Sequence, residues 1–116
     1  MAAATYDILI EQGATFQLDL VYKDSAGAPI DVSGYTARMQ VRRTYDAPTA
    51  LLSLTTENNC ITLGGAAGTV VVKAPATATD NLPAKTGVYD LELISPSGDV
   101  TRLIRGAVSI SPEVTK

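Results

Sequence analysis

The sequence has no histidine and only one cysteine, Cys60, among its 116 residues. Without histidine, the chain lacks the side chain that most often acts as a general base near neutral pH, and it cannot form Ser-His or Cys-His nucleophile pairs. One cysteine can form neither an intramolecular disulfide nor a thiolate metal cluster, so we expect Cys60 to be a small buried or half-buried thiol; the alternative is a reactive one. These absences predict no catalytic residues, no metal site and no cofactor.

Aromatic residues are scarce as well: the chain has no tryptophan, one phenylalanine and five tyrosines. Charged residues make up 18% of the chain and the formal net charge is −3. The nine lysines and arginines are spread along the sequence, which argues against a nucleic-acid partner bound through phosphate neutralisation. No apolar run approaches the roughly 20 residues that span a bilayer, and the first residues lack the basic and apolar regions of a signal peptide. We therefore expect no membrane partner. The lone cysteine and the absence of an N-glycosylation sequon fit synthesis in a reducing cytosol.

Hydrophobic residues make up 46% of the chain, and most of them are valine, leucine, isoleucine and alanine. Threonine is abundant, and glycine and proline stand between the apolar runs, a mixture that favours strands and turns. The length suits one domain. We expect residues 1–116 to form a single β-sandwich domain.

Alternation of apolar and polar residues predicts most of the strands. It is clearest in residues 15–23, where Phe16, Leu18, Leu20 and Tyr22 form one face and Gln17, Asp19, Val21 and Lys23 the other. In residues 35–45 it places Ala37, Met39 and Val41 opposite Arg38, Gln40 and Arg42. Other strands are predicted in residues 6–11, 30–32, 51–56, 60–63, 69–73, 87–94 and 100–104. About seven to nine short strands without helical crossovers indicate an antiparallel sandwich or barrel.

A short helix is expected only near residues 75–85, where Thr77 or Thr79 would cap one or two turns. The glycine-rich residues 64–68 are predicted to form a hairpin turn. A phosphate-binding loop would need Lys-Ser or Lys-Thr directly after the last glycine, and that pair is missing.

The last third of the chain predicts a hairpin around residues 95–99. Pairing that is symmetric about Ser97 sets Glu92 opposite Arg102 on the outer face and Leu91 opposite Leu103 on the inner face. Val108 and Ile110 are out of step with Leu103. We therefore predict a β-bulge near residues 105–106, where a glycine accommodates the extra residue.

Asp90 and Glu92 share one strand face, and Asp19 lies on a strand that could be their neighbour. Paired carboxylates can hydrolyse glycosides. The shortage of aromatic rings to support a sugar argues against that activity and favours solvated acids paired with Arg102 or Lys23. A calcium ion in the Asp24 or Asp99 turn is a further alternative, although neither turn has the acid density of a calcium loop.

Two groups of residues are candidates for a protein interface. Arginine is enriched at interfaces, so Arg38, Arg42 and Arg43 form a candidate docking patch; the alternative is an ordinary solvated strand face. Apolar residues on outer faces can mark contact surfaces, and the candidates of this kind are Val21, Val88 and Ile94.

The order of turn and strand motifs resembles that of a protein family. The motifs lie in residues 12–16, 22–42, 52–58, 61–65, 88–93, 98–103 and 106–115. Over nearly the whole chain they resemble small tailed-bacteriophage virion proteins, and they are similar to the immunoglobulin-like N-terminal domain of baseplate upper proteins. The resemblance implies an immunoglobulin-like sandwich, made in the host cytoplasm and located in the virion.

The resemblance also implies a non-enzymatic structural subunit. The subunit would lie in the tail, in the baseplate or at the tail-fibre attachment. Its partners would be other virion proteins, and many copies of it would form a symmetric assembly. The larger upper proteins continue beyond this domain, so a chain ending at Lys116 is expected to be a free-standing adaptor. A capsid decoration or head-associated protein is the first alternative. A carbohydrate-binding or receptor-binding module is a weaker one, because the chain has no tryptophan.

Overall fold

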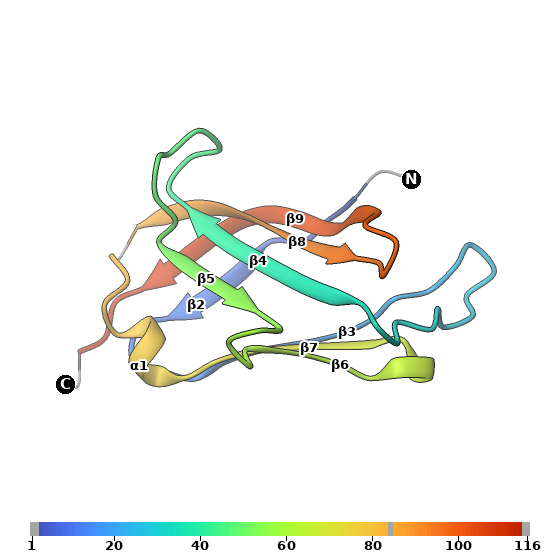
Figure 1. The fold of residues 1–116 in the computed structure, drawn as a ribbon. Helices are drawn as coiled ribbons and strands as arrows, with labels where there is room; N and C mark the ends of the chain where they lie inside the picture. Colours follow the sequence, from blue (N-terminus) through green and yellow to red (C-terminus); the bar gives the residue numbers. More distant parts are fainter. Residues whose placement is uncertain (1–2, 84, 115–116) are drawn as a thin grey trace.

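The computed structural model describes residues 3–83 and 85–114, and its described part is a sandwich of two β-sheets that enclose a hydrophobic core (Figure 1). The strands are β1 (Ala4–Thr5), β2 (Ile8–Glu11), β3 (Phe16–Val21), β4 (Thr36–Arg42), β5 (Leu52–Thr55), β6 (Ile61–Leu63), β7 (Thr69–Ala74), β8 (Thr86–Ile94) and β9 (Val100–Ser111). The two short helices are the 3-10 turn η1 (Gly65–Ala67) and α1 (Ala76–Thr79).

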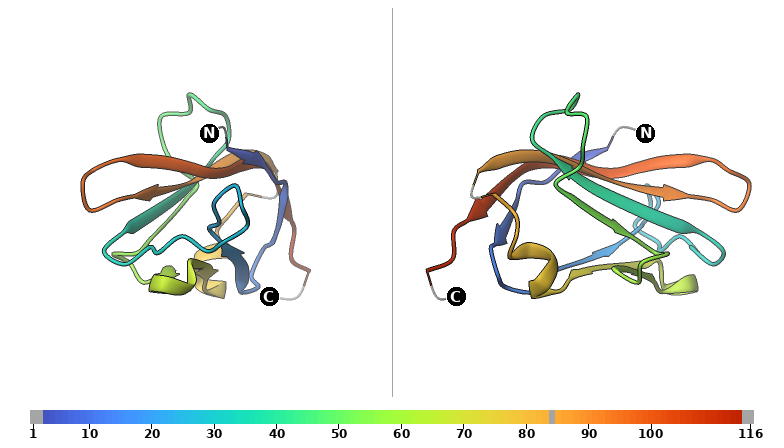
Figure 2. Two further views of the ribbon diagram at one scale, coloured as in Figure 1. Left: turned by 90° about the vertical axis from the view of Figure 1, so that its right-hand side faces the viewer. Right: turned by 60° about the vertical axis from the view of Figure 1, so that its left-hand side comes forward.

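The strand order is that of an immunoglobulin-like sandwich. Sheet A has the order β1-β9-β8-β4-β5, with β2 also paired to β9, and sheet B has the order β3-β7-β6. In immunoglobulin terms, β9, β8, β4 and β5 take the places of strands G, F, C and C′, and β3, β7 and β6 those of B, E and D. The predicted fold class is therefore confirmed. Figure 2 shows the two layers and the loop between β4 and β5, which projects above sheet A.

One edge of sheet A departs from the predicted antiparallel pairing. Both β1 and β2 run parallel to β9, with Ala4 opposite Ile104 and Ile8 opposite Val108. No helical crossover is needed, because nearly the whole domain lies between these strands in the sequence. The strand predicted in residues 6–11 begins only at Ile8, because Tyr6 and Asp7 lie in the break between β1 and β2.

Alternation correctly identifies the buried faces of the central strands. In β4 the side chains of Ala37, Met39 and Val41 are buried, and in β5 those of Leu52 and Leu54 are buried. Burying a large apolar side chain of this kind contributes about 1.5–3 kcal/mol. The outward residues of β4 and β8 are therefore left on one exposed surface.

The β8–β9 hairpin has its bulge two to three residues earlier than predicted. Glu92 is opposite Arg102, as expected, but Leu91 is opposite Ile104, so the extra residue is Leu103. This shift turns Ile104, and later Val108, toward the core. The prediction near residues 105–106 is wrong because Gly106 has another role, which is to let the backbone of Tyr6 pass close by.

The helix lies where the sequence predicts it, but neither threonine caps its start. Pro75 is the N-cap residue, without a side-chain hydrogen bond, and Thr79 is the last helical residue. The buried Thr79 hydroxyl has one proton to donate, and the carbonyl oxygens of Ala14 (2.8 Å) and Ala76 (3.1 Å) both lie within reach of it. The same hydroxyl accepts from the amide of Gly13 (3.1 Å). Ala84, at the end of the predicted helical segment, lies outside the described residues.

One predicted strand is a loop in the structure: in the part of the chain described, residues 30–32 form no strand. The Ile30 amide donates to the Tyr22 carbonyl (2.8 Å), and the Val32 amide donates to the Gly65 carbonyl (3.0 Å). Isolated hydrogen bonds therefore hold this segment in place of a regular β-ladder. The expected turn at residues 58–59 is present, and Asn59 has a positive φ of 66°. Residues 64–68 also form a turn, as predicted.

Candidate functional site

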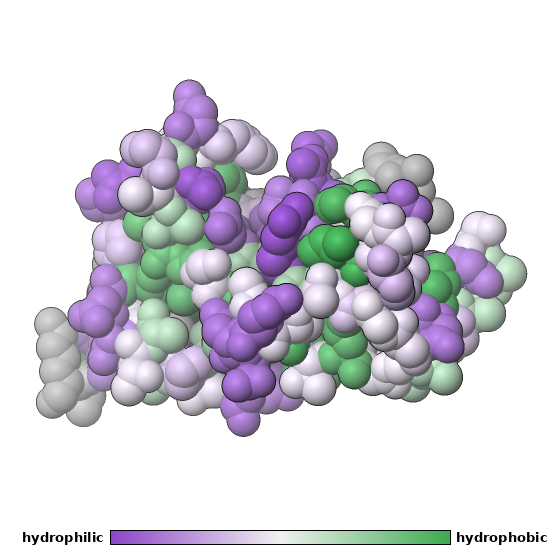
Figure 3. Space-filling model, in the orientation of Figure 1, coloured by the Kyte–Doolittle hydropathy of each residue, from purple (hydrophilic) through white to green (hydrophobic). Residues whose placement is uncertain are grey.

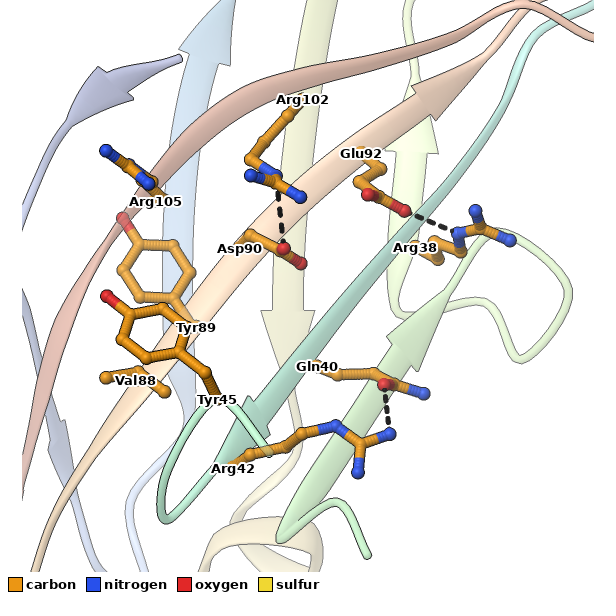
Figure 4. A pocket seen from close by; sticks show the side chains of 10 residues that line it. All are labelled: Arg38, Gln40, Arg42, Tyr45, Val88, Tyr89, Asp90, Glu92, Arg102 and Arg105. Atoms are coloured by element: carbon orange, nitrogen blue, oxygen red, sulfur yellow. Dashed lines mark hydrogen bonds and ion pairs between the residues drawn. The ribbon is translucent and has the colours of Figure 1, made fainter. Parts of the chain in front are cut away.

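A groove of about 420 Å³ lies on the outer face of sheet A, beside the β4–β5 loop (Figure 4). It is lined by Arg38, Gln40, Arg42, Tyr45, Val88, Tyr89, Asp90, Glu92, Arg102 and Arg105, and we call it the arginine groove. In Figure 3 the upper outline of the molecule is hollowed next to this loop, and hydrophilic side chains lie along the hollow.

Strand register explains why these side chains meet. On the central strand β8, Asp90 is opposite Gln40 of β4 and Arg105 of β9. Two residues further along β8, Glu92 is opposite Arg38 of β4 and Arg102 of β9. Because residues two apart share a sheet face, the acids form the middle of the surface and the arginines flank it on both sides.

Two ion pairs cross this surface. Arg38 Nε lies 2.8 Å from Glu92 Oε1, and Arg102 Nε lies 3.3 Å from Asp90 Oδ2. The prediction that the outer acids pair with Arg102 is therefore confirmed for Asp90, whereas Glu92 pairs with Arg38. Lys23 forms no ion pair within residues 3–83 and 85–114. Pairs as open as these contribute at most about 1 kcal/mol each, so they organise the groove more than they stabilise the fold.

The carboxyl of Asp90 has a raised pKa. Partial burial is the main cause, and the charge of Glu92 adds to it, whereas the nearby arginines Arg102, Arg38 and Arg42 act in the opposite direction. The neutral form of Asp90 is thus favoured in the folded protein relative to a free aspartate. The surrounding guanidinium groups are donors without acceptors, a set suited to binding an anion.

Arg42 connects the groove to the loop above it. Its Nη1 donates to the carbonyl of Ala47 (2.7 Å) and its Nη2 to Oε1 of Gln40 (2.9 Å). This holds the loop that carries Tyr45, whose side chain is 76% exposed. The sequence analysis placed Tyr45 at the end of the strand predicted in residues 35–45, but β4 ends at Arg42, so Tyr45 lies in the loop. Its role in the groove was missed because no local pattern shows that this loop folds back beside sheet A.

The structure divides the predicted interface residues. Arg38 and Arg42 line the groove, while Arg43 is exposed outside its lining. Val88 lies in the groove, half-buried, and Ile94 lies further along the same face of β8. Val21 is 43% exposed but belongs to β3, in sheet B. These six residues therefore do not form one patch, and the groove adds Arg105, which the sequence analysis did not single out.

The other predicted acidic arrangements are separated by the fold. Asp19 lies on β3 in sheet B and not beside Asp90. In the Asp24 turn, Oδ1 of Asp24 accepts hydrogen bonds from the amides of Ala26 (2.9 Å) and Ala28 (3.0 Å), as in an Asx turn. In the described part of the chain, no three His, Cys, Asp or Glu residues are grouped to hold a metal ion. No helix described here has the length and apolar character needed to cross a membrane.

A scan against protein-family models finds no match to this chain, and a search of curated proteins finds none either.

Proposed function

We propose that this chain is a non-enzymatic structural subunit of a tailed-phage virion that acts through contacts with other virion proteins. Its place is the tail or baseplate, or the attachment of a tail fibre. The arginine groove carries the protein-contact part of this proposal, because arginine and tyrosine are among the residues enriched in interface centres. The phage setting is supported by the order of motifs along nearly the whole chain.

The groove is also suited to contact on an assembly face. It lies on an open sheet surface, and Tyr45 stands beside it with most of its ring in solvent. A tyrosine of this kind supplies a large contact area at low entropic cost. The paired arginines and acids can set the register of a partner by charge complementarity.

Mass spectrometry and immunogold labelling of purified phage particles test the proposal. We expect the protein in the particles, with label on tails and a constant copy number per particle. Label on heads alone would favour a capsid decoration or head-associated protein instead. Absence from intact particles that contain all other structural proteins would overturn the proposal.

A further inference from the structure

The arginine groove carries more positive than negative charge. It contains four arginines and two carboxylates, so it has a net charge of +2 when all six are ionised, whereas the whole chain has −3. The two carboxylates each hold one arginine, Arg38 or Arg102. Arg42 and Arg105 form no ion pair in the part of the chain that the structure describes. Two guanidinium groups therefore lack a counter-charge.

We propose that the arginine groove binds an acidic segment of a neighbouring protein, whose carboxylates pair with Arg42 and Arg105 and whose chain packs against Tyr45. The inference rests on the proposed function, since the occupant is a protein of the same assembly. A guanidinium group can donate two parallel hydrogen bonds to one carboxylate, which gives both affinity and orientation. The groove volume lies within the range of about 300–1,000 Å³ that is usual for ligand sites.

The geometry of Arg42 prepares it for an anion. Its two hydrogen bonds go to neutral oxygens, of Gln40 and Ala47, so its position is fixed while its charge remains uncompensated. Fixing a binding group before the ligand arrives reduces the entropy lost on binding. In the view of Figure 4, Tyr45 lies between Arg42 and Arg105, where it can cover an extended segment that reaches both.

The same charges disfavour a nucleic acid. Asp90 and Glu92 lie along the middle of the groove and would repel a phosphate backbone. A DNA duplex presents one negative charge about every 1.7 Å, which calls for a continuous basic surface, whereas this groove offers two unpaired arginines on a chain of negative net charge. A protein segment with a few carboxylates therefore complements the two unpaired arginines better than a polyanion does.

The test is a titration of the ¹⁵N-labelled full chain, followed by NMR. The probe is an acetylated and amidated decapeptide of alternating glutamate and glycine, and the controls are the glutamine–glycine analogue and a single-stranded DNA of ten nucleotides. We expect the glutamate peptide to shift the Arg42 and Arg105 Nε–Hε signals and the amides of β4, β8 and β9. The glutamine peptide should leave these signals in place.

Variants separate a defined site from general charge attraction. Arg105→Gln and Tyr45→Ala alter groove residues whose side chains make no hydrogen bond in the described structure, so both should fold normally. We expect Arg105→Gln to weaken binding of the glutamate peptide by at least about fivefold. Tyr45→Ala should weaken it by at least about twofold. The matched control Arg43→Gln removes the same charge outside the groove and should change the affinity by less than about twofold.

Three results would overturn the inference: no shift with the glutamate peptide, equal losses in Arg105→Gln and Arg43→Gln, or tighter binding of the DNA at the same residues. These results leave the particle experiment untouched, so a chain present in tails without peptide binding refutes the groove assignment alone. Conversely, a chain absent from particles refutes the proposed function even if the peptide binds.

Discussion

At the scale of single residues, Gly106 shows how one missing side chain determines a strand crossing. The backbone of Tyr6 passes over Gly106, and a Cβ at this position would overlap the Tyr6 carbonyl oxygen. Next to it, the Ala107 amide donates to Asp7 Oδ1 (2.9 Å), and the Tyr6 amide donates to the Arg105 carbonyl (2.8 Å). The N-terminal segment is therefore held against β9 at the point between β1 and β2.

We predict that Gly106→Ala destabilises the protein by about 1–3 kcal/mol, because an added methyl group meets backbone atoms that cannot move aside easily. Urea unfolding followed by circular dichroism measures the loss. The control is Ala107→Ser, which adds one atom to an exposed neighbouring residue and should change the free energy of unfolding by less than about 0.5 kcal/mol. Equal stability of Gly106→Ala and the unmodified chain would refute the close approach.

Tyr89 connects the same crossing to sheet A. Its buried hydroxyl donates to the Tyr6 carbonyl. The pKa of Tyr89 is raised to about 12, mainly because the group is buried and to a smaller extent because Tyr6 and Asp7 lie nearby. The folded state therefore holds this proton more tightly than the unfolded state, in which tyrosine has a pKa near 10. The resulting stabilisation is fully present below about pH 10 and is lost as the pH rises through 12.

We predict that Tyr89→Phe lowers the free energy of unfolding by about 1 kcal/mol at pH 7, because the Tyr6 carbonyl loses its donor. The difference between the two proteins should become smaller from pH 10 upward. Unfolding curves at pH 7, 9 and 11.5 measure it. Tyr45→Phe is the control at pH 7, where its exposed hydroxyl contributes no hydrogen bond in the described structure. A difference that stays constant up to pH 11.5 would contradict the raised pKa.

At the scale of elements, α1 is too short to be stable by itself and depends on its attachment. Thr79 provides that attachment, since its hydroxyl joins the end of the helix to the turn between β2 and β3. The sequence indicated a threonine at this helix, but as a cap. The difference arises because two partners of Thr79, Ala14 and Gly13, lie 65 and 66 residues away in the sequence, beyond any local pattern.

We predict that Thr79→Val destabilises the fold by about 1–3 kcal/mol, since the shape is kept while the half-buried Gly13 amide loses its acceptor. Thr79→Ser should recover most of the loss, and Thr77→Val, at an exposed position of the same helix, should have little effect. Thermal unfolding of the three variants provides the comparison. If Thr79→Val and Thr77→Val were equally stable, the attachment would be disproved.

The β8–β9 hairpin shows how far local patterns reach at this scale. The pairing of Glu92 with Arg102 follows from the turn, and so it was predictable. The bulge at Leu103 was not, because two neighbouring apolar residues, Leu103 and Ile104, both suit the inner face. Which of them continues the ladder depends on packing against the rest of the core.

At the scale of the whole molecule, the core between the two sheets carries the stability. Leu91 on β8 is fully buried in the centre of this core, whereas Leu9 on β2 is 55% exposed. We predict that Leu91→Ala costs about 2–5 kcal/mol of unfolding free energy. Leu9→Ala, the matched control, should cost less than about 0.5 kcal/mol. Chemical unfolding distinguishes them, and similar losses in both would mean that the core lies elsewhere.

The sequence by itself determined which face of each central strand is buried, because side chains alternate with a period of two and the apolar face must leave water. It also indicated several of the turns, the position of the short helix and an all-β sandwich or barrel, whereas the immunoglobulin-like strand order was established by the strand pairing of the structure. Only the tertiary structure decided the parallel docking of β1 and β2 on β9 and the making of the arginine groove. Arg38 and Glu92 are 54 residues apart in the chain and adjacent in space. Such contacts follow from strand pairing across the whole domain, which no local pattern of residues records.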